Sequence, residues 1–190
     1  MPNAPSLFER TEEWKDIAEK GHELGNHSVY HPCRKSRPGR EWVPRHHDLD
    51  EYSLEKMVEE LTTANTFLKA LDGKTERTFT PPCGDLMAGI EKEYIEKLRE
   101  LFIAYKGQGT ETGFSVVWAP NEVSGRELID YIKNLPAGTS LVNIIFHGVG
   151  GDYLTVSSEA HEELLQFLAN NSRDYYVDTY FNIMKYANTH

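Results

Sequence analysis

Short apolar segments alternate with amphipathic helical segments along most of this 190-residue chain. The clearest helix carries apolar residues at three- and four-residue steps from Leu54 to Leu71, with Ser53 as a favourable N-cap and Gly73 as a favourable stop. We expect further helices at about 11–20, 90–101, 124–135, 158–169 and 180–186, and strands at about 22–24, 77–80, 102–105, 114–118, 141–146 and 175–179. Strands that alternate with helices pair in parallel, with functional residues on the loops that follow them. The pattern predicts a single α/β domain spanning residues 1–190.

Composition and charge narrow the classes of function. The chain is 39% hydrophobic and 11% aromatic, which is typical of an ordered globular protein. Its formal net charge of −10 argues against nucleic acid or an anionic membrane surface as a partner, since both attract clustered positive charge. The one basic segment, residues 34–45, is interpreted as a solvated loop.

The sequence gives no sign of export or of a membrane anchor. No apolar run approaches the ~20 residues that a transmembrane helix needs. The opening residues, Met1 to Pro5, are polar and lack the pattern of a signal peptide. We therefore expect no membrane span and no signal peptide in this chain, and its localisation stays open.

A histidine-rich segment at residues 21–32, with the sequence GHELGNHSVYHP, is the strongest candidate for a functional site. His27 and His31 are four residues apart, so a short helical turn would place both rings on one face. Two neutral imidazoles and a carboxylate are a common ligand set for catalytic zinc. Gly25 and Asn26 indicate a tight turn after the strand at 22–24, and the proline after His31 keeps the helical turn brief. The alternative is a chance pair of histidines on a solvated face.

This segment closely resembles the metal-binding segment of the polysaccharide deacetylases, the NodB-like enzymes of carbohydrate esterase family 4. The resemblance implies an irregular (β/α) barrel and a divalent metal ion bound by His27 and His31. Zn is the first expectation for that ion, and Co and Ni are alternatives. In the family pattern His22 lies on the strand and is not a ligand.

A second segment, residues 77–84 with the sequence RTFTPPCG, is similar to the family's Arg-Pro-Pro-Tyr-Gly motif. The residues that match the motif, and that are expected at the substrate site, are Pro81, Pro82 and Gly84. Thr80 stands where Arg is usual, and Cys83 stands where Tyr is usual. The resemblance implies that the backbone N–H of Cys83 helps to stabilise the oxyanion, and a backbone donor survives a change of side chain. The structural alternative is a Pro-Gly turn at the end of a strand.

The thiol of Cys83 has further interpretations. It could be inert, a nucleophile or a metal thiolate, and no Cys–His–Asn pattern supports the nucleophile. Two cysteines are too few for a disulfide framework. Because Cys33 directly follows the histidine segment, however, the two thiols could lie close enough to form one disulfide. Two free thiols in the unreduced protein would exclude that pairing.

The most apolar run, residues 141–146, leads to His147 and then to glycines that let a ligand approach the backbone. This pattern resembles the family's last motif, whose histidine protonates the leaving group. An imidazole pKa near working pH suits that role. The alternative is a histidine held by hydrogen bonds in a loop. Trp118, at the end of another predicted strand, is a candidate for stacking on a sugar ring or for the core.

One motif of the family is absent from this chain. The Thr-Phe-Asp-Asp-Gly motif of the first strand, which supplies the catalytic base and an aspartate metal ligand, has no counterpart here. We therefore expect a barrel that lacks its first strand or strands. Three accounts stay open: a longer natural chain, a substitute carboxylate, or a protein that no longer catalyses. The substitute carboxylates considered are Asp48, Asp85 and Asp152.

The sequence thus predicts a metal-dependent hydrolase that removes N- or O-linked acetyl groups from a carbohydrate, with His147 and the Cys83 backbone in catalysis. A small-amide hydrolase of the same fold is a lesser alternative. The competing prediction is an inactive remnant of the fold that binds carbohydrate or metal. An acidic chain suits a neutral or partly cationic sugar polymer. Missing strands would expose sheet edges, so we also expect a homo-oligomer in which neighbours cover them.

Overall fold

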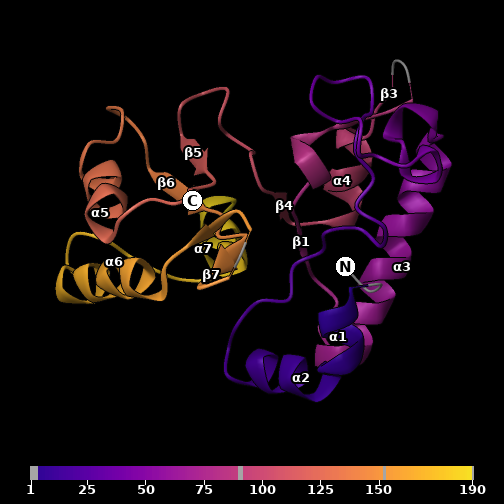
Figure 1. Cartoon of the computed structure of the whole chain (residues 1–190). Coiled ribbons are helices and arrows are strands. Elements are labelled where there is room, and N and C mark those ends of the chain that lie inside the picture. Colours follow the sequence, from indigo (N-terminus) through magenta and orange to yellow (C-terminus); the bar gives the residue numbers. More distant parts are fainter. Residues whose placement is uncertain (1–3, 90–91, 152, 190) are drawn as a thin grey trace. The chain divides into compact units, whose positions relative to one another are not determined.

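The computed structural model describes residues 4–89, 92–151 and 153–189, which form two compact units (Figure 1). Residues 1–106 and 179–190 belong to the first unit, and residues 107–178 belong to the second. The first unit contains α1 (Pro5–Glu9), α2 (Thr11–Glu19), α3 (Leu54–Asp72), β1 (Thr78–Phe79), β2 (Met87–Ala88), β3 (Lys92–Glu93), α4 (Ile95–Leu101), β4 (Ala104–Tyr105) and α7 (Tyr180–Ala187). The second unit contains β5 (Ser115–Trp118), α5 (Gly125–Lys133), β6 (Leu141–Ile144), β7 (Gly148–Val149), β8 (Thr155–Val156) and α6 (Ser158–Asn170).

The described strands pair two by two. β1 pairs with β4, β5 with β6 and β7 with β8, all in parallel, whereas β2 and β3 form an antiparallel pair. A helix lies between the partners in sequence in the first two cases, α4 before β4 and α5 before β6. The parallel pairing predicted from the alternation of elements is therefore confirmed for these pairs.

Local capping interactions set the start of α3 and α5 and the end of α3. The Oγ of Ser53 accepts the N–H of Lys56 at 3.1 Å at the start of α3, and Gly73 ends that helix with φ at 72°. α5 begins at a reciprocal capping box between Ser124 and Glu127. None of the described helices combines the length and the apolar character needed to cross a bilayer.

Several predicted boundaries are wrong because long-range pairing overrides local pattern. No strand forms at 22–24; instead Asn26 makes one parallel bridge to Phe79, so Gly25 and Asn26 do not form a tight turn. Among the described residues of the segment 90–101, the helix begins at Ile95, because β3 pairs with β2 just before it. Residues 90 and 91 lie outside the described part of the chain. The segment 175–179 is not a strand and leads directly into α7.

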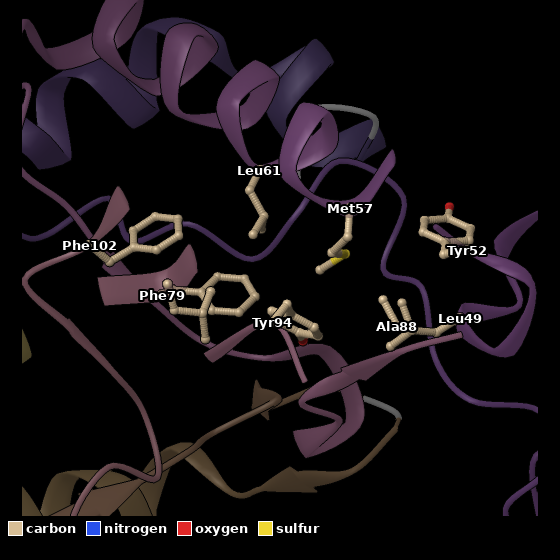
Figure 2. Close-up of a cluster of buried hydrophobic side chains, with 9 residues drawn as sticks. Leu49, Tyr52, Met57, Leu61, Phe79, Ala88, Tyr94 and Phe102 are labelled. Atoms are coloured by element: carbon tan, nitrogen blue, oxygen red, sulfur yellow. The ribbon is translucent and has the colours of Figure 1, made fainter. Parts of the chain in front are cut away.

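The core of the first unit packs α3 against β1 and α4 (Figure 2). Figure 2 shows Met57 and Leu61 pointing from α3 toward Phe79 and Tyr94, and all four side chains are buried. Phe79 also stacks on Phe102, with ring centroids 5.2 Å apart. Phe79 is the last residue of β1, so this packing fixes the start of the segment Thr80–Gly84 that follows.

The core of the second unit packs α5 against α6. Its buried residues are Leu128, Ile132, Ala160 and Leu164. Side chains at the ends of β5 and β6, Trp118 and Ile144, pack against this cluster. The loops after these two strands are therefore anchored by the same core.

Candidate functional site

His27 and His31 lie side by side, with ring centroids 4.8 Å apart in an edge-to-face arrangement. The expected helical turn is wrong, because residues 27–31 form a loop in which Ser28 and His31 adopt φ values of 61° and 56°. Residues with a Cβ adopt this left-handed conformation at an energetic cost, so other contacts must hold it. The pairing of the rings comes from this loop and not from helical periodicity.

Two buried polar side chains hold the histidine loop against α3. The side-chain amide of Asn26 donates to a carbonyl of α3 at 2.9 Å, and its oxygen accepts the N–H of Ser28 at 2.8 Å. From α3, Oε1 of Glu60 accepts the N–H groups of Val29 and Tyr30 at 3.1 and 2.9 Å. Because these groups are shielded from water, losing a partner would leave buried donors unsatisfied.

The role of Glu60 was not predicted from the sequence, although a signal was present. Glu60 lies on the apolar face of α3, between the buried residues Met57 and Leu61, and is 7% exposed. A carboxylate on the buried face of a helix needs hydrogen-bond donors, and here the histidine loop supplies them.

The environment of His27 fixes its tautomer. Its Nδ1 lies 2.6 Å from the carbonyl oxygen of Thr80, which can only accept, so Nδ1 carries the proton and Nε2 keeps its lone pair. Burial, together with the neighbouring His31, lowers the pKa of His27 to about 4. The ring is therefore neutral at pH 7 and suited to bind a metal ion through Nε2.

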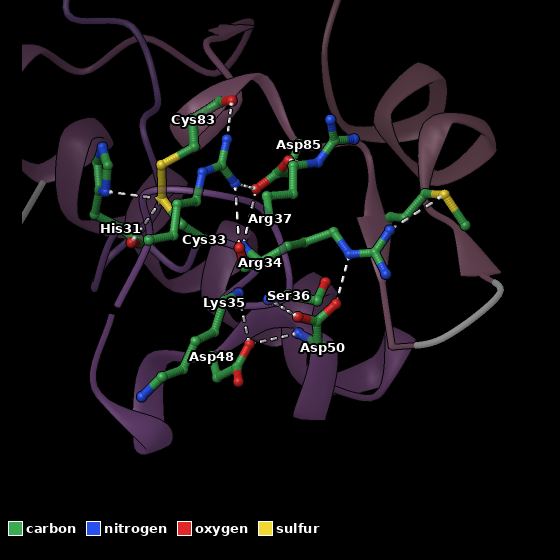
Figure 3. A network of polar contacts seen from close by, with 12 residues as sticks. His31, Cys33, Arg34, Lys35, Ser36, Arg37, Asp48, Asp50, Cys83 and Asp85 are labelled. Atoms are coloured by element: carbon green, nitrogen blue, oxygen red, sulfur yellow. Dashed lines mark hydrogen bonds and ion pairs between the residues drawn. A yellow bond between two sulfur atoms is a disulfide. The ribbon is translucent and has the colours of Figure 1, made fainter. Parts of the chain in front are cut away.

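Cys83 lies in a one-turn 3-10 helix (Pro82–Gly84) and forms a disulfide with Cys33, with Cα atoms 5.8 Å apart (Figure 3). The hypothesis of a disulfide is confirmed, and the structure shows no free thiol at Cys83 that could act as a nucleophile or thiolate. Pro81 and Pro82 are buried, whereas Gly84 is exposed. The disulfide joins the segment that follows the histidine pair to the segment that follows β1.

The prediction that residues 34–45 form a solvated loop is wrong for two of the arginines. The side chains of Arg34 and Arg40 are 17% and 16% exposed, and they pair with Asp50 and Asp85 respectively. Figure 3 shows the pair of Arg34 and Asp50. Asp85 is 1% exposed, also pairs with Arg37, and accepts the N–H of Arg34 at 2.9 Å. Burying that carboxylate requires several donors, and the basic segment supplies them.

Neither of the described candidate carboxylates joins the histidine pair. Asp85 is engaged by arginines, and Asp48 accepts the N–H groups of Lys35 and Asp50 at 3.1 and 3.0 Å. Asp152 lies outside the described residues. The site thus offers a divalent ion two imidazoles, from His27 and His31, and no carboxylate oxygen from the described residues completes the set.

His147 and Trp118 belong to the second unit. His147 is exposed and follows the end of β6 by three residues. Trp118 is the last residue of β5 and pairs in register with Ile144 of β6. Its ring packs against that of Tyr131 at a tilt, with ring centroids 4.2 Å apart. Both residues therefore lie at or just beyond the carboxyl end of one parallel strand pair. Their roles toward substrate stay predictions.

The contacts of Glu60 predict an effect on both stability and metal binding. Glu60→Ala leaves the buried N–H of Val29 and the partly buried N–H of Tyr30 without their acceptor. We therefore expect the free energy of unfolding to fall by about 1–3 kcal/mol and zinc binding to weaken. Urea titration followed by circular dichroism and calorimetric zinc titration measure the two effects. Glu59→Ala, an exposed neighbour on the same helix, should change stability by less than about 0.5 kcal/mol. Equal losses in the two variants would contradict this role.

The buried ring of His27 predicts a pH dependence of stability in the metal-free protein. Its pKa is about 4 in the folded chain, against an ordinary value of 6.5. The unfolded chain therefore binds the proton first, and the free energy of unfolding falls as the pH decreases from about 6.5 toward 4. In His27→Gln we expect this fall to be smaller by about 1–3 kcal/mol, measured by urea titration across that range. His22→Gln, at an exposed position, is the control; pH profiles of wild type and His27→Gln that run parallel would refute the assignment.

The chain is similar to a known protein family and to solved structures. The family model described as "Polysaccharide deacetylase" matches residues 4–101. The structure resembles wild-type BA3943, a CE4 family pseudoenzyme from Bacillus anthracis, with a TM-score of 0.57 and 15% identity over 94% of this chain and 52% of that one. It also resembles a mutant of BA3943, with a TM-score of 0.56 and 14% identity over 94% of this chain and 53% of that one.

The chain spans about half the length of those two structures, and at such identities the likeness shows the fold alone. No curated protein matched the sequence. The family model covers more than half of the chain and includes the histidine loop, the disulfide and the segment after β1. The chain therefore belongs to the polysaccharide deacetylase family.

Proposed function

We propose that this chain carries the metal-binding part of a hydrolase that removes N- or O-linked acetyl groups from a carbohydrate. The observation that carries the proposal is the pairing of His27 and His31. Nδ1 of His27 donates to the carbonyl of Thr80, and Nε2 keeps the lone pair that can bind a metal ion. We further propose that the fold is an irregular (β/α) barrel that is incomplete in this chain. Its parallel strand pairs and its coverage of about half of the CE4 structures support this.

In this proposal, His27 and His31 hold a divalent ion, Zn in the first place and Co or Ni as alternatives. A bound ion of this kind polarises the acetyl oxygen and lowers the pKa of water. The backbone N–H of Cys83 would donate to the oxyanion, and His147 would protonate the leaving amine or alcohol. Trp118 and the exposed Gly84 would contact the sugar, while the buried prolines Pro81 and Pro82 shape the loop.

A second candidate function is binding of carbohydrate or metal without turnover. It is favoured by the arrangement of carboxylates, because no Asp or Glu among the described residues joins the histidine pair as a ligand or base. The two similar solved structures are also described as those of a pseudoenzyme. The two candidates share the metal site and differ in whether acetate is released.

One experiment separates the two candidates. The chain is incubated with acetylated chito-oligosaccharide or acetylated xylan and added zinc or cobalt, and released acetate is measured. A hydrolase requires the metal, loses activity in His27→Gln, and loses about 100-fold or more in His147→Ala because the leaving group is no longer protonated. His22→Ala is the matched control and should retain full activity. Binding of metal or sugar without acetate release would establish the second candidate. No binding of metal or of sugar, together with no release of acetate, would refute both. Equal metal binding by His27→Gln would refute the metal site assigned to the histidine pair.

We also propose that the chain forms a homo-oligomer. β4, β5 and β6 each have one edge without a strand partner among the described residues, and an unpaired edge favours pairing with another copy. Sedimentation velocity should therefore show species larger than a monomer as concentration rises. A clean monomer at high concentration would refute this.

A further inference from the structure

The Cys33–Cys83 disulfide lies next to His31 (Figure 3). The Sγ of Cys33 is 3.4 Å from Nδ1 of His31. The ligand atoms of His31, Cys33 and Cys83 all lie within 4.8 Å of one another. Within the described parts of the chain, no other three His, Cys, Asp or Glu residues gather in this way. A sulfur in a disulfide is a poor metal ligand, whereas a thiolate is a strong one.

We propose that reduction of this disulfide creates a zinc site, in which the two thiolates of Cys33 and Cys83 and one imidazole nitrogen of His31 bind a single ion. Cys₂His with an open fourth position is a known ligand set for zinc. The proposal goes beyond the deacetylase function. It can be tested independently of that function, because it requires neither a substrate nor His27.

The geometry allows this change without moving the backbone far. A tetrahedral zinc ion with bonds of about 2.0–2.3 Å separates its ligand atoms by about 3.3–3.8 Å. The three ligand atoms are already within 4.8 Å, so rotation of the two cysteine side chains is enough to open the space. The carbonyl of Cys33 accepts the N–H of Leu49 at 3.0 Å, and the carbonyl of Cys83 accepts from Arg40 at 3.0 Å. These contacts keep both cysteines in place after the S–S bond is broken.

The charges of the ligands also suit the ion, because two thiolates balance the charge of one zinc ion. The arginines nearby, Arg34 and Arg40, are already paired with Asp50 and Asp85.

The redox step balances with a dithiol as the reductant. The dithiol loses two electrons and two protons and becomes a disulfide, while the Cys33–Cys83 bond breaks to give two thiols. Zinc then displaces both thiol protons into solvent. An oxidising disulfide reverses the step by taking two electrons from the thiolates, so the S–S bond forms again and zinc is released. Because His31 belongs to both sets of ligands, an ion in the thiolate site withdraws His31 from His27.

Cobalt titration tests the proposal on the intact chain. The chain is reduced with a phosphine, which becomes its oxide with oxygen from water, and is then freed of reductant and titrated with Co²⁺ without air. The reduced chain should bind one equivalent and show the near-ultraviolet absorption of thiolate-to-cobalt charge transfer, whereas the oxidised chain should lack that absorption. This comparison needs no substitution, so it holds even where a variant misfolds. A reduced chain without the absorption would overturn the proposal.

Variants identify the ligands and separate this site from the proposed catalytic one. Cys33→Ser, Cys83→Ser and His31→Gln should each weaken cobalt binding to the reduced chain by about 100-fold or more, since each loses a direct ligand. His27→Gln should keep the charge-transfer absorption, although it removes the histidine pair of the proposed deacetylase site. Full binding by His31→Gln, or loss of the absorption in a folded His27→Gln chain, would refute the assignment of ligands. Circular dichroism of each variant establishes that it is folded.

Discussion

The hydrogen bonds between α3 and residues 26–30 support the geometry of the candidate site. Two residues of the loop, Ser28 and His31, adopt left-handed conformations that cost about 1–3 kcal/mol each. The buried carboxylate of Glu60 accepts two hydrogen bonds from the loop, and a hydrogen bond to a charged group contributes about 1.5–3 kcal/mol. Together with the bonds of Asn26, these contributions are large enough to offset the conformational cost. Contacts with α3 therefore hold the histidine pair in position, although α3 itself contributes neither histidine.

A covalent link adds a second support to the same loop. The Cys33–Cys83 disulfide joins segments 50 residues apart, and closing a loop of that length stabilises a folded chain by about 4 kcal/mol in the chain-entropy model. The ion pairs of Arg34 with Asp50 and of Arg40 with Asp85 surround this link and are largely buried. Reduction would remove the link but leave the ion pairs and the contacts of Glu60. This is why a reduced chain can keep its cysteines close enough for a metal ion.

The segments that carry the proposed site residues are each stabilised by different contacts. The histidine loop depends on α3, and the segment after β1 depends on the packing of Phe79. His147 follows a strand pair anchored by the core of α5 and α6. No single interaction among these contacts is needed by all three. Each of these segments is therefore held by contacts that do not depend on catalysis.

The sequence by itself determined the features that local interactions decide. Caps at Ser53, Gly73 and Ser124 and apolar periodicity located α3 and α5. The segment around His27 and His31 resembled the deacetylase family, to which the chain belongs. The tertiary structure alone decided how that pair is held. The bridge from Asn26 to Phe79, the bonds from Glu60 to the loop, and the burial of Arg40 with Asp85 join residues 30 or more positions apart. Such contacts form only after the chain packs, so no local pattern specifies them in advance.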